Sequence, residues 1–299
     1  MISAAQIAAY EEDGFVVVED VLSTDEVSAL RRVTDELVES ARGVTENNSV
    51  YDLETTHSAQ EPRVRRIKNP EAQHEVYASV MRNANILAIL QKLASPAIRF
   101  DASKLNLKAA GYGAAVEWHQ DWAFYPHTND DLCAVGVMMD DMELENGPLL
   151  FLPGSHRGPV YDHHAEGRFC GAIDPTRDGL DFGAAVACTG KAGSISIHPA
   201  RTIHGSALNT SDRPRRLLLF QYRAADAWPL LGVHQQDWDA WNALLLCGDT
   251  DPVVPRCTDV PVRLPFPGPV NEGSIYEAQR GLKHNFFARV EAQAGAVGG

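Results

Sequence analysis

The chain has 299 residues, of which 44% are hydrophobic and 22% are charged, a composition that excludes a globally disordered protein. Its 26 basic and 40 acidic side chains give a net charge of −14, which disfavours binding to nucleic acid or to an anionic membrane surface. The apolar runs are much shorter than the roughly 20 residues of a membrane span. Five scattered cysteines without a CxxC pair, and an N-terminus without a signal peptide's basic residues, predict a cytoplasmic protein.

The first part of the chain predicts helices. Capping-box patterns begin at Ser3 and at Ser23, and the second is followed by apolar residues at helical spacing. Between them, the β-branched run within 14–19 predicts a strand. The polar stretch 43–63 has no periodicity and predicts a long loop, whereas 77–93 predicts a third helix.

After residue 96 the sequence becomes typical of a β protein. Strands are predicted over 98–108, 114–119, 132–139, 148–152, 193–198 and 215–223, separated by Gly, Pro, Asn and Asp turns. Short strands at this spacing favour a barrel or sandwich. We therefore expect one domain, mainly β with flanking helices: N-terminal helices over about 1–95, a jelly-roll core over about 96–225 and a C-terminal extension over about 226–299. Within it, Gly-rich 162–192 predicts a long insertion and 272–292 an amphipathic helix.

The motif His119-Gln-Asp121 follows a predicted strand and is the first candidate for chemistry. Residues two apart in a strand point to the same side, so both side chains can reach one metal ion. His204 comes after another strand-like segment and is a candidate third ligand. Two histidines and one carboxylate form the facial site of non-haem Fe(II) oxygenases. A histidine two residues before an aspartate also arises by chance in surface turns.

Arg215, eleven residues after His204, strengthens this interpretation. A hairpin between the two would place them on neighbouring strands. A buried arginine would suit the far carboxylate of 2-oxoglutarate, because its planar fork binds both oxygens, and the Ser206 hydroxyl could add a hydrogen bond. Strand alternation does not tell which face is inside, so a surface cluster with Arg213 and Arg216 remains the alternative.

These features together resemble the phytanoyl-CoA dioxygenase family of Fe(II)- and 2-oxoglutarate-dependent oxygenases. The HxD motif, the distal histidine and the arginine eleven residues later match its pattern, and Asn146–Arg157 resembles its NG-…-PGSH signature. The resemblance covers most of the chain. It implies a double-stranded β-helix, a cupin-like jelly-roll barrel, that uses Fe(II), 2-oxoglutarate and O2.

The resemblance also implies roles for particular residues. It implies His119, Asp121 and His204 as metal ligands and catalytic centre, and Arg215, Ser206, Asn106, Lys104 and Arg66 as cosubstrate-binding residues. Trp122, Phe124 and Tyr125 directly follow the HxD motif and are candidates for substrate contact, with ordinary core packing as the alternative.

The predicted reaction is hydroxylation of an unactivated C–H bond of a small molecule, with release of succinate and CO2. Desaturation or epimerisation by the same cofactor chemistry is an alternative, as is a non-catalytic jelly-roll binding protein, which would lack a ligand or the anchoring arginine. Halogenation requires a small residue in place of the carboxylate ligand, and Asp121 argues against it. The sequence leaves the substrate and the oligomeric state open.

Overall fold

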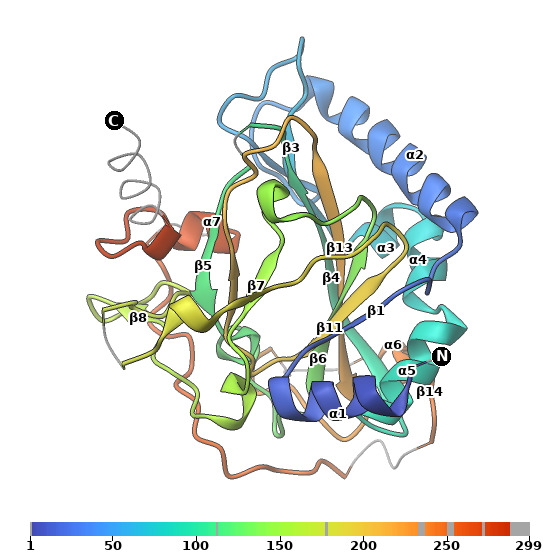
Figure 1. Cartoon of the computed structure of the whole chain (residues 1–299), viewed down its shortest axis with the longest axis vertical. Helices are drawn as coiled ribbons and strands as arrows, with labels where there is room; N and C mark the ends of the chain where they lie inside the picture. Colours follow the sequence, from blue (N-terminus) through green and yellow to red (C-terminus); the bar gives the residue numbers. More distant parts are fainter. Residues whose placement is uncertain are drawn as a thin grey trace.

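Two facing antiparallel sheets, covered on one side by helices, form the centre of the molecule (Figure 1). The computed structural model describes residues 2–111, 113–176, 179–232, 237–249, 254–270 and 273–287. None of the helices in these ranges is long and apolar enough to cross a membrane.

The large sheet has eight strands. Its order is β1 (Val16–Val18), β11 (Ile195–Pro199), β6 (Leu132–Met138), β13 (Arg215–Ala224), β4 (Ile98–Lys108), β3 (Val64–Lys68) and β2 (Tyr51–Leu53), and β14 (Leu245–Cys247) also pairs with β4. The small sheet runs β10 (Val186–Ala187), β7 (Leu149–Phe151), β12 (His204–Ser206) and β5 (Val116–His119), and β8 (His164–Ala165) pairs separately with β9 (Arg168–Phe169). This is the predicted jelly-roll architecture, mainly β with flanking helices.

Helices cover the outer face of the large sheet. They are α1 (Ala4–Asp13), α2 (Thr24–Ser40), α3 (Pro70–Gln73), α4 (Glu75–Met81) and α5 (Ala84–Leu93); α6 (Trp238–Ala243) and α7 (Ile275–Ala278) follow the last long strand. Apolar side chains of α2, α4 and α5, such as Leu30, Tyr77 and Leu90, form one core with Leu218 and Phe220 of β13. Alternate residues of β13 therefore face the helices, and Arg215 and its same-face neighbours point between the two sheets.

The structure confirms both capping boxes, the strand within 14–19 and the six predicted strand regions after residue 96. The predicted helix over 77–93 is wrong in its continuity. The chain breaks between α4 and α5, where the Asn83 side chain accepts hydrogen bonds from the next helix's first N–H groups. Asparagine competes well for such caps, which is why the apolar spacing did not reveal the break.

Two other predictions need correction, and a third, the insertion, gains detail. The stretch 43–63 is not a bare loop, because it contains β2 at the sheet edge. The insertion 162–192 contains β8, β9 and β10, and its Ile173 and Phe182 pack against Trp118. The expected helix over 272–292 is not continuous: α7 ends at Ala278 and turns follow, while residues 288–292 lie outside the described part.

Candidate active site

The structure brings His119, Asp121 and His204 together between the sheets. His119 ends β5, and His204 begins β12 directly opposite it in the antiparallel register. The Nε2 atoms of His119 and His204 lie 3.7 and 4.0 Å from Asp121 Oδ1. One candidate donor atom from each residue lies within 4.8 Å of the others, and all three side chains are buried.

Hydrogen bonds fix the two imidazoles in the form that a metal needs. Nδ1 of His119 donates to the Glu117 carbonyl at 2.8 Å, and Nδ1 of His204 donates to the Thr202 carbonyl at 3.0 Å. This leaves the Nε2 lone pairs free to bind a metal. Burial lowers the pKa of His119 to about 4 and that of His204 well below its usual range, so both rings are neutral at pH 7.

Asp121 supplies the charge of the site. Burial opposes its ionisation, but the neighbouring His198, His204 and Lys104 hold the pKa of Asp121 well below its usual range. One carboxylate and two neutral imidazoles are the donor set that suits Fe(II). The three residues therefore fit the iron that the sequence pattern predicts.

His198 is a third buried histidine at this centre, and its place in the site was not predicted from the sequence. It lies on β11, with Nε2 3.7 Å from Asp121 Oδ2 and its ring centroid 4.4 Å from that of His204. Neither ring nitrogen has a hydrogen-bond partner among the described residues. Alternation within the predicted strand places His198 on one face with Ser194 and Ser196, a polar row that could have identified it.

A row of polar side chains leads from the histidines along the inner face of the large sheet. Lys104, Asn106 and Lys108 of β4 share one face, and Lys108 lies opposite Arg215 of β13. The four residue steps from Lys104 to Lys108 span roughly 13 Å of strand. Asn106 Oδ1 and Arg215 Nε are buried and have no hydrogen-bond partner in the described structure. Unpaired buried polar atoms of this kind are costly and indicate a missing ligand.

Arg215 is buried between the sheets, as the oxygenase interpretation requires. It is 1% exposed, and its guanidinium donates to the Gly147 carbonyl. Arg216 faces the opposite side and pairs with Asp140, whereas Arg213 is exposed. The surface-cluster alternative is therefore wrong for Arg215.

The predicted hairpin between residues 204 and 215 is also wrong. β12 pairs with β5 and β7 in the small sheet, whereas β13 pairs with β4 and β6 in the large sheet. The chain between them crosses from one sheet to the other. His204 and Arg215 therefore belong to different walls of the site and are not on neighbouring strands.

A cavity of about 350 Å3 opens beside Asp121. Its lining consists of Arg66, Lys68, Asn69, Ala102, Ser103, Lys104, Asp121, Phe124, Tyr125, Leu219, Gln221, Gly273, Ser274 and Ile275. Three of these residues, Arg66, Lys68 and Lys104, are basic, and one, Asp121, is acidic. Arg66 and Lys68 share one carboxylate, Asp52, at 2.7 and 2.8 Å. Lys104 forms no ion pair or hydrogen bond within the described chain, and burial lowers its pKa.

Two of the three predicted substrate residues line this cavity. Tyr125 accepts a hydrogen bond from Gln221, and the Phe124 ring stands edge-on to His119 with 5.6 Å between centroids. Trp122 is placed differently. It is 1% exposed and packs with Leu132 and neighbouring alanines, which is the core packing that the sequence left as the alternative.

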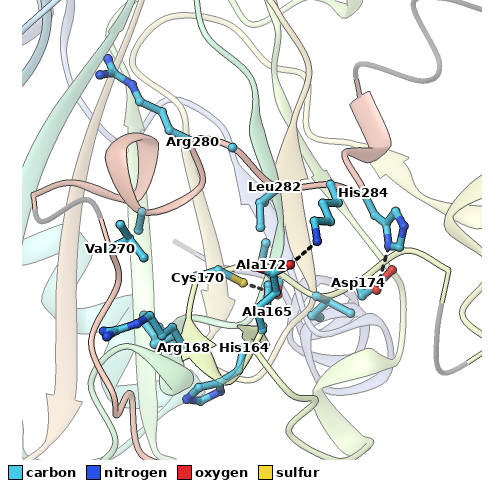
Figure 2. Close-up of a pocket in the computed structure, with 16 residues that line it drawn as sticks. His164, Ala165, Arg168, Cys170, Ala172, Asp174, Val270, Arg280, Leu282 and His284 are labelled. Carbon is cyan, nitrogen blue, oxygen red and sulfur yellow. Dashed lines mark hydrogen bonds and ion pairs between the residues drawn. The ribbon is translucent and has the colours of Figure 1, made fainter.

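A second cavity, of about 280 Å3, lies between the insertion and the C-terminal segment (Figure 2). Its His284 pairs with Asp174 at 3.1 Å on the opposite wall. Phe169 lines this cavity and packs edge-on against Phe124, which in turn contacts His119. Two aromatic rings thus separate this cavity from the cluster of His119, Asp121 and His204.

The model of the family "Phytanoyl-CoA dioxygenase (PhyH)" matches residues 10–217, more than half of the chain. The chain belongs to the phytanoyl-CoA dioxygenase family. The match contains all three candidate ligand residues and Arg215, and the resemblance seen in the sequence is confirmed. The protein is an Fe(II)- and 2-oxoglutarate-dependent dioxygenase, in agreement with its curated relatives.

Three related proteins show which activities occur in this family. A "Probable alpha-ketoglutarate-dependent hypophosphite dioxygenase" of Stutzerimonas stutzeri is 36% identical over 95% of this chain and 99% of its own length. An L-proline trans-4-hydroxylase of Streptomyces griseoviridis is 29% identical over 84% and 94%. The crystal structure of EctD from S. alaskensis with 2-oxoglutarate and 5-hydroxyectoine is 27% identical, with a TM-score of 0.62 over 75% of this chain and 77% of that one.

Proposed function

We propose that this dioxygenase oxidises a small anionic substrate, with hypophosphite as the leading candidate. The observation that carries the proposal is the positive wall of the cavity beside Asp121. Even with Lys104 assigned to the keto-acid end of 2-oxoglutarate, Arg66 and Lys68 share only one carboxylate. One positive charge therefore remains for a second anion, and because the Arg66 and Lys68 side chains are only 16% and 25% exposed, an anionic partner there is favourable.

The size of the cavity supports a small substrate. Its volume of about 350 Å3 is at the lower end of the range for ligand sites and must also receive part of the cosubstrate. The S. stutzeri relative that is 36% identical is named as a probable hypophosphite dioxygenase. Hypophosphite is a small anion with a single negative charge, which such a cavity could hold beside the cosubstrate.

We assign the cosubstrate to the polar row on β4 and β13. Arg215 and Ser206 would hold its distal carboxylate, Asn106 its middle and Lys104 its keto-acid end beside the metal ligands. His119, Asp121 and His204 would hold the iron, which supplies the site at which O2 is activated. The prediction that Arg66 contacts the cosubstrate stays a prediction, and the variants below test it.

The balanced reaction gives a direct assay. Hypophosphite, 2-oxoglutarate and O2 would yield phosphite, succinate and CO2, with one oxygen atom entering each of the first two products. Proton-coupled 31P NMR distinguishes the triplet of hypophosphite from the doublet of phosphite. We expect phosphite and succinate in equal amounts. Succinate formation that a panel of small anions leaves unchanged would contradict the anionic substrate.

A zwitterionic amino acid is the second candidate. Ser103 on the cavity wall donates to Glu71, which places a carboxylate near the opening that could meet an ammonium group. L-Proline belongs in the same panel, because a proline hydroxylase is among the relatives. A product that gains one oxygen atom on carbon would favour this candidate.

Replacement of Arg66 shows whether this residue binds the substrate or 2-oxoglutarate. Arg66→Gln should raise KM for the anionic substrate by about tenfold, the size expected for loss of a charge-assisted hydrogen bond. If the KM for 2-oxoglutarate rises instead, Arg66 belongs to the cosubstrate. Lys92→Met, an exposed change on α5, is the control for the loss of one positive charge.

A further inference from the structure

His198 is a buried polar residue that has no role in the site as described so far. It lies on β11 and is 1% exposed, and the rings of Phe151 and His204 pack beside it with centroid distances of 4.8 and 4.4 Å. Neither Nδ1 nor Nε2 has a hydrogen-bond partner among the described residues. Buried ring nitrogens without a partner are unfavourable, so a histidine at this position needs an acceptor nearby.

The contacts of His198 differ from those of the two candidate metal ligands. Nδ1 of His119 and Nδ1 of His204 each donate to a backbone carbonyl, which leaves both Nε2 atoms free to bind a metal. In the described structure no carbonyl accepts from Nδ1 of His198. Because nothing holds the proton on Nδ1, Nε2 of His198 can carry it and act as a donor.

The Asp121 carboxylate lies between these two kinds of histidine. Its Oδ1 is 3.7 Å from Nε2 of His119 and 4.0 Å from Nε2 of His204. Its Oδ2 is 3.7 Å from Nε2 of His198. A movement of about 0.8 Å would bring Oδ2 and this Nε2 to an ordinary hydrogen-bond distance of about 2.9 Å. One oxygen of Asp121 therefore faces the candidate ligands, and the other faces a donor.

The number of carboxylate oxygens on the metal decides what else the metal can bind. In octahedral Fe(II), His119, His204 and one oxygen of Asp121 occupy one face and leave the opposite face open. The keto-acid end of 2-oxoglutarate supplies two donor atoms to that face, and O2 needs the position that remains. A second oxygen of Asp121 on the metal would take this position.

We propose that His198 is a positioning residue that donates from Nε2 to Asp121 Oδ2 and thereby limits Asp121 to one bond with the metal. A hydrogen bond to an ionised carboxylate is short and strong, and it holds the accepting oxygen away from the metal. The inference rests on the assignment of His119, Asp121 and His204 as ligands, and it is independent of which substrate the enzyme oxidises.

Nitric oxide, a diatomic probe for the O2 position of Fe(II), tests this role without turnover and without substrate. It is titrated anaerobically into protein loaded with Fe(II) and 2-oxoglutarate, and its binding is followed by electron paramagnetic resonance. His198→Phe keeps a ring but removes the donor. We expect it to bind nitric oxide at least about tenfold more weakly, the effect of one charge-assisted hydrogen bond. Its iron content and its Kd for 2-oxoglutarate should stay within about twofold of the wild type.

Two further variants separate the donor from the packing of the ring. His198→Gln restores an N–H donor and should recover part of the nitric oxide affinity. Ser194→Ala is the matched control, because Ser194 lies on the same side of β11, is also 1% exposed and also has an unpartnered side-chain oxygen. It should bind iron, 2-oxoglutarate and nitric oxide as the wild type does.

Three results would overturn the proposal. The first is unchanged nitric oxide affinity in His198→Phe. The second is equal weakening in His198→Phe and His198→Gln, or a parallel loss of iron and 2-oxoglutarate, which would give His198 a purely structural role. The third is a wild-type protein that retains no Fe(II), which would remove the ligand assignment and this inference with it.

Discussion

The candidate metal ligands give the sharpest expectations for single side chains. His204→Ala removes one neutral imidazole from a cluster held by two strands, so we expect the bound Fe(II) to fall well below one per chain and succinate formation to be lost. Metal analysis and circular dichroism would check this. His284→Ala changes an exposed histidine paired with Asp174 and is the matched control. A His204→Ala protein with full metal content and activity would contradict the assignment.

Arg215 carries the second residue-level prediction. Arg215→Ala should weaken 2-oxoglutarate binding by at least about tenfold, because a charge-assisted pair is lost and a carboxylate is left without its partner. Arg215→Lys should recover only part of the affinity, since the planar fork is absent. Anaerobic calorimetry with Arg213→Ala as the control measures both. Equal 2-oxoglutarate affinities of the wild type and Arg215→Ala would show that another residue binds the distal carboxylate.

Between elements, the turn at Gly171 supports the active-site aromatic ring. Gly171 has a φ of 65°, and a Cβ there would lie 2.6 Å from the Phe124 ring, which stands against His119. Gly171→Ala should therefore destabilise the fold by about 1–3 kcal/mol through backbone strain and overpacking, and should lower kcat. Gly167→Ala, at a φ of 78° with no atom within 4 Å, isolates the backbone contribution.

Chemical denaturation and kinetics of the two glycine variants give the comparison. If Gly171→Ala and Gly167→Ala lower the free energy of unfolding equally and both keep full activity, the turn at Gly171 does not determine the position of the Phe124 ring. A larger loss in Gly171→Ala would show that the insertion fixes the wall of the site.

How much the sequence predicted also differs between elements. Strand regions 98–108 and 215–223 were predicted well because long apolar alternation has few competing interpretations. The partner of each strand was not predictable: the sequence suggested a 204–215 hairpin, and the structure places the two strands in opposite sheets. The cluster of His119, Asp121 and His204 was expected from its spacing, whereas His198 was missed because its significance depends on partners distant in sequence.

At the scale of the whole molecule, the C-terminal segment is fastened to the barrel by buried polar and aromatic contacts. Glu277 of α7 pairs with Arg65 of β3, and both side chains are buried. Gln279 bonds the Glu117 N–H at 3.1 Å and the Gly171 carbonyl at 2.7 Å. Phe287 stacks on Trp118. The segment thereby places Ser274 and Ile275 on the wall of the cavity.

Glu277→Ala should release this segment. It leaves the Arg65 charge buried and unpaired, which costs about 3–5 kcal/mol. We expect faster amide exchange across residues 273–287 and a higher KM for the substrate, with less change in the large sheet. Glu166→Ala removes the exposed partner of Lys283 and is the control. Uniform exchange rates in Glu277→Ala and wild type would show that the ion pair does not hold the segment.

The pairing of β1 with β11 has a consequence for synthesis of the chain. β1 ends at Val18, and its partner strand begins at Ile195. At roughly 5–20 residues per second, a ribosome needs on the order of ten seconds or more to deliver that partner. Until then β1 has no strand to pair with and its buried valines, Val16 and Val18, are not covered by the sheet. The nascent protein must therefore pass through a long interval that favours aggregation, so slower or cooler expression, or a chaperone that shields the N-terminal segment, should raise the soluble yield.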